Sequence, residues 1–587
     1  MDLVAAFVAP LRVDTHPSRL FLHIAAYIFS GMAFYILYRL LKRFVRIYRS
    51  PLRSIPGPAS TSLFFGSVTE VSESDAYRLF ERWSTTWGPT FRYSSIFNAN
   101  KLYTADLSAW NHVLSSELYV KSNILTRFSP AFSTHLSTGL LFVEGTRHRQ
   151  LVSRQDNSYV LDMPFELNAY LFFKRKIMGS AFSYAQVKQF TNIFFSKSLE
   201  LRDIWIAELS AEERTEIDVF VWMNRLTLDT IGLAGFDHDF DSLQVAGVPG
   251  SHAEELLQAV RDLFTFNFYT VSFMIQLFFP LARLFPTKLS RVSSTAIETI
   301  RRVGLQMIAE KRELLRAQGS TKGRASDLMS LLIETTMAKD IPTEDRMTDS
   351  EILAQIPSAL LAGHELPSSV TVTWTLFSLA CSPVVQHKLR EELWTIDTER
   401  PTMDDLMSLP YLDAVVREGL RVHTPVGFTE RIATKTDFIP LLVPVTDVNG
   451  CQRKEIRVEK GDKLYLPLRA INRSRDIWGS DAEQFRPERW LEGIPEAAKA
   501  IPSAWSNITS FLAGAHACIG YRVALLQVKS TLFTLIRHFE FELAISPEDI
   551  IRRNNIVGRP YLGSDPESGA QLPLLVRAHK RDADELN

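Results

Sequence analysis

The stretch FLAGAHACIG, residues 511–520, places a cysteine between glycines, directly before a segment with helical periodicity, YRVALLQVKSTLFTLIRHFEFEL. A cysteine at the start of a helix faces unpaired backbone N–H groups and the positive end of the helix dipole, which together favour the thiolate. Glycines let the backbone approach a flat ligand closely. A thiolate shielded by amides suits haem iron; the alternative is an inert buried cysteine, the commoner state of a lone one. The positions that fit the pattern F-x-x-G-x-[RH]-x-C-x-G are Phe511, Gly514, His516, Cys518 and Gly520.

The composition is that of a large globular protein. The 587 residues are 46% hydrophobic and carry a formal net charge of −1, so the chain can bury a large core. Near-neutrality argues against nucleic acid as the main partner. Three scattered cysteines, Cys381, Cys451 and Cys518, are too few for a disulfide framework, which favours a reducing compartment.

Residues 20–41, LFLHIAAYIFSGMAFYILYRLL, predict a single transmembrane helix, because about 20 apolar residues cross a bilayer. A buried core helix and a cleaved signal peptide are the alternatives. The basic residues that follow, beginning with Lys42 and Arg43, place the rest of the chain in the cytosol by the positive-inside rule. We therefore expect a short lumenal tail (1–19), the anchor (20–41), a basic, proline-rich hinge (42–58) and one catalytic domain (59–587).

A second stretch, residues 347–383, predicts one long helix bent at Pro357. Thr348 and Glu351 form a capping box at its start, and the sequence Cys381-Ser-Pro383 ends it. The centre reads Ala-Gly-His-Glu, residues 362–365, and a glycine followed by an acid is unusual within a helix if packing alone decides.

Two further stretches predict a buried ion cluster. Glu418 and Arg421 lie three residues apart on one helix face with apolar flanks. Buried charges must be paired, and the motif FRPERW, residues 485–490, supplies Arg489 to complete a Glu–Arg–Arg cluster.

Together these four motifs resemble the cytochrome P-450 family, in wording close to its fungal members, over nearly all of the chain after residue 56. The resemblance implies a mainly α-helical fold with small β-sheets, in which residues 437–468, with a turn at Asn449-Gly450, fit one sheet. It implies haem b with Cys518 as the axial iron ligand, flanked by Phe511, Gly514, His516 and Gly520. The Glu418–Arg421–Arg489 cluster would be structural.

The same resemblance implies a monooxygenase of the endoplasmic reticulum membrane. Such an enzyme inserts one oxygen atom from O2 into a lipophilic small molecule and receives electrons from NADPH through a separate NADPH–cytochrome P-450 reductase. The family's substrate-lining segments correspond to residues 123–139, 360–369, 423–428 and 555–561, which are mostly apolar and favour a terpenoid, steroid-like or aromatic substrate of secondary or xenobiotic metabolism. The aromatic segment 262–288 either dips into the membrane or forms core helices.

The long helix departs from the family pattern after Gly363 and Glu365. The family usually has a threonine next, whereas this chain has Leu366 and Pro367, which offer no hydroxyl. We hypothesise that Glu365, a water and Ser368 or Ser369 replace the missing proton relay; alternatively the serines only bond back to their own helix. The departure also leaves open a haem-thiolate isomerase or dehydratase that needs no O2, or a non-productive haem-binding gene product.

A second departure lies within a helix that the resemblance places against the haem propionates. Removing residues 152–174 brings His148 and Arg175 into the family spacing, from which both could reach the propionates. The removal keeps the reading frame, Val152-Ser153 can be encoded by GTAAGT, and Lys174 can be encoded by AAG. We interpret these 23 residues as a retained intron, with a genuine surface loop as the alternative. Arg431, in the stretch FTERIA, is a weaker candidate propionate partner.

Overall fold

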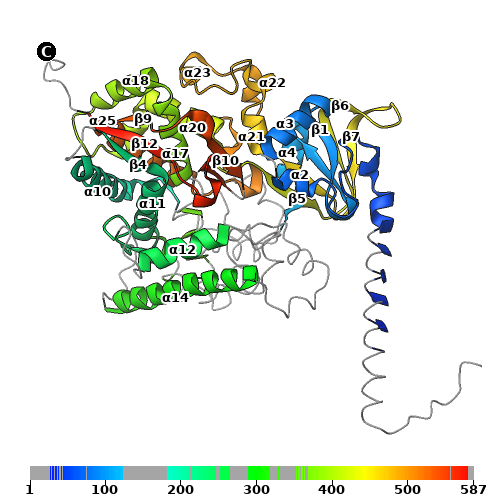
Figure 1. The fold of residues 1–587 in the computed structure, drawn as a ribbon, viewed down its shortest axis with the longest axis horizontal. Helices are drawn as coiled ribbons and strands as arrows, with labels where there is room; N and C mark the ends of the chain where they lie inside the picture. The colour runs from blue at the N-terminus through cyan, green and yellow to red at the C-terminus, as the bar shows by residue number, and fades with distance from the viewer. Residues whose placement is uncertain are drawn as a thin grey trace, which may run out of the picture.

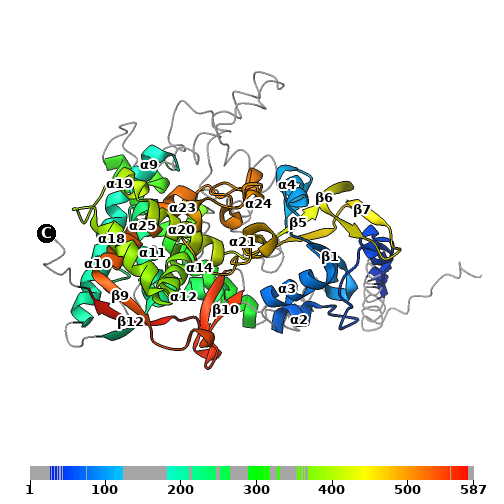
Figure 2. The ribbon, with the colours of Figure 1, turned by 90° about the horizontal axis from the view of Figure 1, so that it is seen from above.

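The computed structural model describes residues 44–73, 76–122, 182–209, 214–245, 252–264, 288–317, 327–330, 368–554 and 557–579. It also describes isolated positions within residues 27–42 and at 333, 352, 355–356, 359–360 and 362–363. The described part consists mainly of helices with four small sheets, as expected. Most of the helices gather at one end of the long axis, and the largest sheet lies at the other end together with α2 (Val68–Glu73), α3 (Ala76–Trp87) and α4 (Leu107–Ser115) (Figures 1 and 2).

The largest sheet has the strand order β1-β2-β8-β5-β3, and only the β2–β8 pair is parallel. A three-stranded antiparallel sheet has the order β4-β12-β9, and β6–β7 and β10–β11 form two antiparallel hairpins. The strands are β1 (Thr90–Ser94), β2 (Asn100–Thr104), β3 (Tyr119–Lys121), β4 (Thr215–Asp218), β5 (Thr429–Ala433), β6 (Asp437–Thr446), β7 (Gln452–Val458), β8 (Lys463–Leu466), β9 (Phe539–Leu543), β10 (Ile550–Asn554), β11 (Gly558–Leu562) and β12 (Pro573–Ala578).

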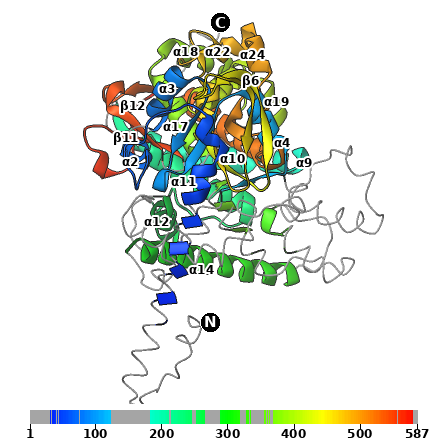
Figure 3. The same cartoon turned by 90° about the vertical axis from the view of Figure 1, so that its right-hand side faces the viewer.

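Helix α25 (Tyr521–His538) runs through the helical end and is buried on every side from Leu525 to Ile536. It packs against α10, α17, α18 and α20. The other α-helices are α2 (Val68–Glu73), α3 (Ala76–Trp87), α4 (Leu107–Ser115), α9 (Tyr184–Gln189), α10 (Thr191–Leu209), α11 (Val219–Phe236), α12 (His252–Phe264), α14 (Lys288–Ala317), α17 (Val370–Ala380), α18 (Pro383–Trp394), α19 (Met403–Ser408), α20 (Pro410–Val422), α21 (Leu468–Asn472), α22 (Arg475–Trp478), α23 (Arg489–Glu492) and α24 (Glu496–Lys499). Helices α12 and α14 pack on each other along one side of the molecule (Figure 3).

The expected long helix is present in parts. The described positions between residues 352 and 363 are helical, Ser368 and Ser369 form a π-helical turn, and α17 continues to Ala380. Cys381 caps α17, and Pro383 opens α18, so the helix ends where the sequence predicts. The π-helical turn directly follows the proline at position 367, whose missing N–H removes one regular helical hydrogen bond. Thr348, Glu351 and Pro357 lie outside the described residues.

The N-terminal helix joins the sheet end of the molecule. Arg46 donates to the carbonyl of Lys460 at 2.9 Å and lies 3.5 Å from Oδ1 of Asp462. Further along, the Val448 amide in the β6–β7 turn donates to the Ser54 carbonyl at 2.8 Å. The described N-terminal residues project away from the sheet (Figure 1). No helix among the described residues is long and apolar enough to span a membrane, and most of the expected anchor, residues 20–41, lies outside them.

Candidate haem-thiolate site

Two short 3-10 helices and α25 position the cysteine. Phe511 ends the first, η9 (Thr509–Phe511), and Gly514 begins the second, η10 (Gly514–His516). The Cys518 amide donates to the Phe511 carbonyl at 2.9 Å, and Gly520 is the N-terminal cap residue of α25. Cys518 is half-buried and forms no disulfide with any described residue. This loop therefore presents a thiol two residues before the positive end of an 18-residue helix.

Glycine is required at position 514 for two independent reasons. Its φ of +68° lies in the left-handed region, which costs L-residues roughly 1–2 kcal/mol. A Cβ there would also stand 2.2 Å from the carbonyl oxygen of Leu114 at the end of α4. At Gly520, in contrast, the nearest described atom to a Cβ is 3.6 Å away in Phe182, an ordinary contact.

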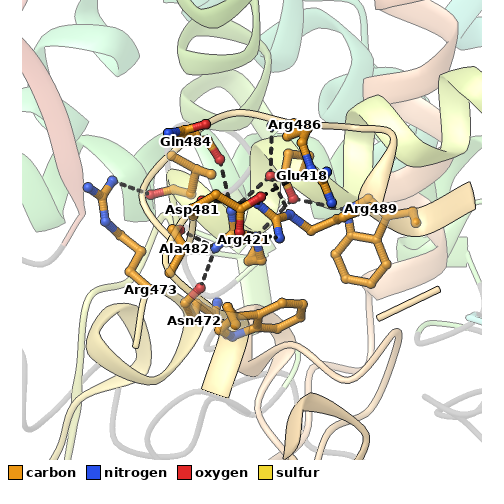
Figure 4. A network of polar contacts seen from close by, with 12 residues as sticks. Glu418, Arg421, Asn472, Arg473, Asp481, Ala482, Gln484, Arg486 and Arg489 are labelled. Atoms are coloured by element: carbon orange, nitrogen blue, oxygen red, sulfur yellow. Dashed lines mark hydrogen bonds and ion pairs between the residues drawn. The ribbon is translucent and has the colours of Figure 1, made fainter. Parts of the chain in front are cut away.

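The predicted ion cluster forms around Glu418 (Figure 4). Arg421 donates from Nε and Nη2 to the two carboxylate oxygens, both at 2.8 Å, and Arg489 Nε donates to Oε1 at 2.9 Å. The indole N–H of Trp490 adds a bond of 3.0 Å and the Arg486 amide one of 2.9 Å. The side chains of Glu418, Arg421 and Arg489 are at most 2% exposed.

The Nη1 and Nη2 atoms of Arg421 also bind backbone carbonyls of residues 472–484. Its Nη1 donates to the carbonyls of Asn472, at 2.8 Å, and Ala482, and its Nη2 donates to Gln484 at 3.0 Å. Its guanidinium also lies 5.1 Å from the Trp478 ring. Asn472 accepts the Thr509 amide at 2.9 Å with its side-chain oxygen. The cluster is thereby linked to η9 and so to the cysteine loop.

The basic residues predicted to bind haem differ in burial, and two of them lie outside the described residues. Arg431 on β5 is 1% exposed, and its Nη1 donates to Thr429 Oγ1 at 2.6 Å and to the Glu430 carbonyl at 3.0 Å. His516 is half-buried in η10. His148, Arg175 and the whole of residues 152–174 lie outside the described residues.

On the long helix the structure places Gly363 and Ser369 against α11. A Cβ at position 363 would stand 2.6 Å from Ile231 Cδ1, so a larger residue there would require the Ile231 side chain to move. Ser369 is buried and donates to Asn224 Oδ1 at 2.8 Å. The relay hypothesis for Ser369 therefore requires this bond to open. Glu365, with Leu366 and Pro367, lies outside the described residues.

Sequence analysis missed Asn224 and Trp490 as partners of these residues. Asn224 is a polar residue within the apolar run VFVWMN, and that contrast was an available signal. Trp490 stands in the quoted motif, but nothing in its spacing says that its N–H reaches Glu418.

The donor chemistry of the loop fits haem. The Cys518 thiol precedes a helix N-terminus, the close-packed Gly514 fixes the loop, and the buried Arg431 on β5 offers a positive charge. The other two cysteines lack this setting: Cys381 caps the C-terminal end of α17, and Cys451 follows the β6–β7 turn.

Comparison with known proteins identifies the class. The family model for cytochrome P-450 matches residues 168–563. Cytochrome P-450 monooxygenases 205 and 128 of Postia placenta are 41% and 40% identical to this chain, each over 91% of it and 94% of the relative. The monooxygenase claO of Ampulloclitocybe clavipes is 34% identical over 94% of this chain and 98% of its own. The chain therefore belongs to the cytochrome P-450 family: it is a haem-dependent oxidoreductase of the monooxygenase type.

Proposed function

We propose that this protein is a membrane-anchored haem-thiolate monooxygenase that inserts one oxygen atom from O2 into a lipophilic small molecule. The observation that carries the proposal is the placement of Cys518 directly before α25. Its loop is closed by the hydrogen bond from the Cys518 amide to the Phe511 carbonyl, and Gly514 packs against Leu114. Haem b bound through this sulfur would supply the oxygen-activating chemistry.

The chain's own residues would hold the group in place. The N-terminal end of α25 favours negative charge on Cys518. The Phe511 side chain, 4% exposed, anchors the loop in the hydrophobic core. Cationic side chains form strong hydrogen bonds with carboxylates, and we assign the haem propionates to Arg431, His148 and Arg175. His516 would contact the haem from the cysteine loop. Glu365 and Gly363 would line the oxygen side of the pocket, with Ser369 available only if it leaves Asn224.

Apolar residues within the segments assigned to the substrate support the proposed substrate class. Leu360 and Val557 are at most 3% exposed, and Phe428 stacks on Tyr465 at 4.6 Å. Apolar side chains in these segments favour an apolar substrate. We therefore keep the terpenoid, steroid-like or aromatic class of secondary or xenobiotic metabolism. We also keep the single-pass anchor in the endoplasmic reticulum, membrane lipid as a contact, and NADPH–cytochrome P-450 reductase as electron donor.

The first experiment is the absorption spectrum of the reduced, carbon-monoxide-bound chain beside that of Cys518→Ala. A thiolate-type Soret band that disappears only in the variant supports the proposal. A band that persists in Cys518→Ala, or its absence from the unaltered chain, contradicts the assignment of Cys518.

Turnover separates the monooxygenase from the alternatives. NADPH oxidation by the reconstituted reductase, with product formation that requires O2, is the expected result. Product formed without NADPH and O2 would instead identify an isomerase or dehydratase, which the leucine and proline after Glu365 leave open.

A further inference from the structure

Three segments far apart in the sequence meet beside the proposed pocket: α17, the chain after α20, and the β10–β11 hairpin (Figure 1). The chain after α20 and the start of β11 belong to the segments assigned above to the substrate. What holds them together is therefore relevant to which substrate fits.

Trp374 on α17 is the centre of this contact. Its indole N–H donates to the Gly558 carbonyl at 2.8 Å, and its ring stacks on His423, with centroids 5.0 Å apart and planes 6° apart. His423 Nε2 lies 2.7 Å from Ser378 Oγ, one turn further along α17. Trp374 is 4% exposed, so this bond forms away from water and orients both partners.

The hairpin is fastened from its other strand as well. Arg552 on β10 donates through Nη2 to the carbonyls of Thr424 and Pro425, the latter at 3.2 Å, and its guanidinium carbon lies 5.8 Å from the Trp374 ring. The Gly558 amide donates to the Pro425 carbonyl at 3.0 Å. A Cβ at position 558 would stand 1.9 Å from Arg552 Nε, so this arrangement needs glycine there.

The charges are consistent with a permanent contact. Burial, and then the positive charge of Arg552, hold the pKa of His423 well below its usual range. The imidazole is therefore neutral at physiological pH and does not repel the neighbouring guanidinium. The neutral Trp374–His423 stack and the positively charged Arg552 thus hold the backbones of Pro425 and Gly558 together.

We infer that Trp374 and Arg552 are positioning residues for substrate: they fix the start of β11 against residues 425–428 and so set the shape of the apolar pocket. This inference rests on the proposed function, because the pocket is assigned to substrate there. Both side chains act through the backbone of other residues.

The test uses the full-length chain and a ligand series that binds iron in the same way throughout. Imidazole, 1-butylimidazole, 1-octylimidazole and 1-dodecylimidazole share the coordinating nitrogen, so the ratio of their Kd values to that of imidazole reports the alkyl-binding pocket alone. Trp374→Phe removes the N–H and keeps the ring. Trp205→Phe is the matched control, because Trp205 is fully buried and its N–H has no acceptor among the described residues.

We expect Trp374→Phe to keep the thiolate-type band and to change the long-chain ratios about threefold to tenfold, the effect of one buried hydrogen bond. Trp205→Phe should leave the ratios unchanged. Equal ratios in Trp374→Phe and the unaltered chain, both with normal bands, overturn the inference while leaving the proposed function intact. Absence of the band from the unaltered chain overturns the proposed function itself and the inference with it.

Arg552→Lys provides the second variant should Trp374→Phe fail to fold. Lysine keeps the charge but loses the planar fork that spans two carbonyls. We expect it to change the same long-chain ratios with a normal band. Unchanged ratios in Arg552→Lys would overturn the inference.

Discussion

At the scale of single residues, Glu418 carries more of the site's architecture than its role as a partner of Arg421 suggests. It accepts hydrogen bonds from Arg421, Arg489, Trp490 and the Arg486 amide without access to water. Its negative charge compensates the buried Arg421 and, together with Asp481 at 3.2 Å, the buried Arg489.

We expect Glu418→Gln to destabilise the fold by about 3–5 kcal/mol, because it leaves the buried Arg421 without its carboxylate partner, whereas Arg489 keeps its ion pair with Asp481. The free energy of unfolding in denaturant and the yield of the thiolate-type band would both fall. Glu496→Gln is the matched control, since the Glu496 side chain is 87% exposed beside Lys499. Equal losses in the two variants would contradict the prediction.

Gly514 is the residue on which the geometry of the loop depends most directly. Gly514→Ala should abolish the thiolate-type band, because the new methyl group meets the Leu114 carbonyl and the backbone stays left-handed. Gly493→Ala separates these two causes, since Gly493 has φ of +107° but nothing within 4 Å of a Cβ. A normal band in Gly514→Ala would show that the loop tolerates displacement from α4.

At the scale of elements, buried carboxylates join helices to strands. Asp106 caps α4 through the amides of Ser108 and Ala109, at 2.9 and 3.1 Å, and accepts the amides of Leu442 and Val443 in the β6 bulge. One side chain thus joins the helix packed on the cysteine loop to the β6–β7 hairpin.

Asp106→Ala is expected to lower the free energy of unfolding by roughly 2–4 kcal/mol, more than the loss of an ordinary helix cap. The reason is that the substitution removes both the cap and the acceptor of two strand amides. Ser183→Ala removes a cap with one bond, to the Gln186 amide, and should cost about 1 kcal/mol. Thermal unfolding of both variants measures the difference. Similar Tm losses would mean that the strand amides find other acceptors.

Asp229 on α11 holds the turn before α12 by accepting the amides of Ser242 and Leu243, at 2.7 and 3.0 Å. Burial raises the pKa of Asp229 to about 7, against the partial opposing effect of those amides and of Lys197. The fold therefore favours the protonated form. This contribution to stability is complete below about pH 4, the pKa in the unfolded chain, and is lost as the pH rises through 7.

Denaturant midpoints measured from pH 5 to 8 test whether the stability falls as the pH rises. The unaltered chain should lose stability over this range relative to Asp229→Asn, whose side chain does not titrate. Parallel curves would contradict a raised pKa at this position.

At the scale of the whole molecule, the cysteine loop, the ion cluster and the three-segment contact of α17, residues 423–425 and the β10–β11 hairpin lie within residues 370–562. The N-terminal helix meets the other end, through Arg46 and the chain before β8. Residues 152–174 come before this region, and the family match begins inside them, at residue 168.

We propose that these 23 residues are absent from the functional protein. A chain without residues 152–174 is expected to give a stronger thiolate-type band per mole of protein than the full sequence, because His148 and Arg175 regain the family spacing. The same deletion combined with Cys518→Ala should give no band. An equal band in the full chain, or a dominant transcript that contains the 23 codons, would identify a genuine loop.

The local motifs were predictable because their signals lie within a few residues. The cysteine pattern, the i, i+3 spacing of Glu418 and Arg421, and the turn at Asn449-Gly450 each depend on neighbours in sequence, and the structure brings these residues together. The close approach of the Ile231 side chain to Gly363 was not predictable, because Ile231 belongs to another helix.

The sequence by itself determined the end of one helix at Cys381, the start of the next at Pro383 and the identity of the cluster residues, since caps, prolines and charge spacing act locally. The class of fold followed from the resemblance of the four motifs to the cytochrome P-450 family. Only the tertiary structure decided that Ser369 bonds to Asn224, 145 residues away, and that Trp374 holds Gly558, 184 residues away. The physical reason is that a buried donor needs an acceptor but does not specify which one. The packing of α11, α17 and the β10–β11 hairpin places one particular acceptor within reach.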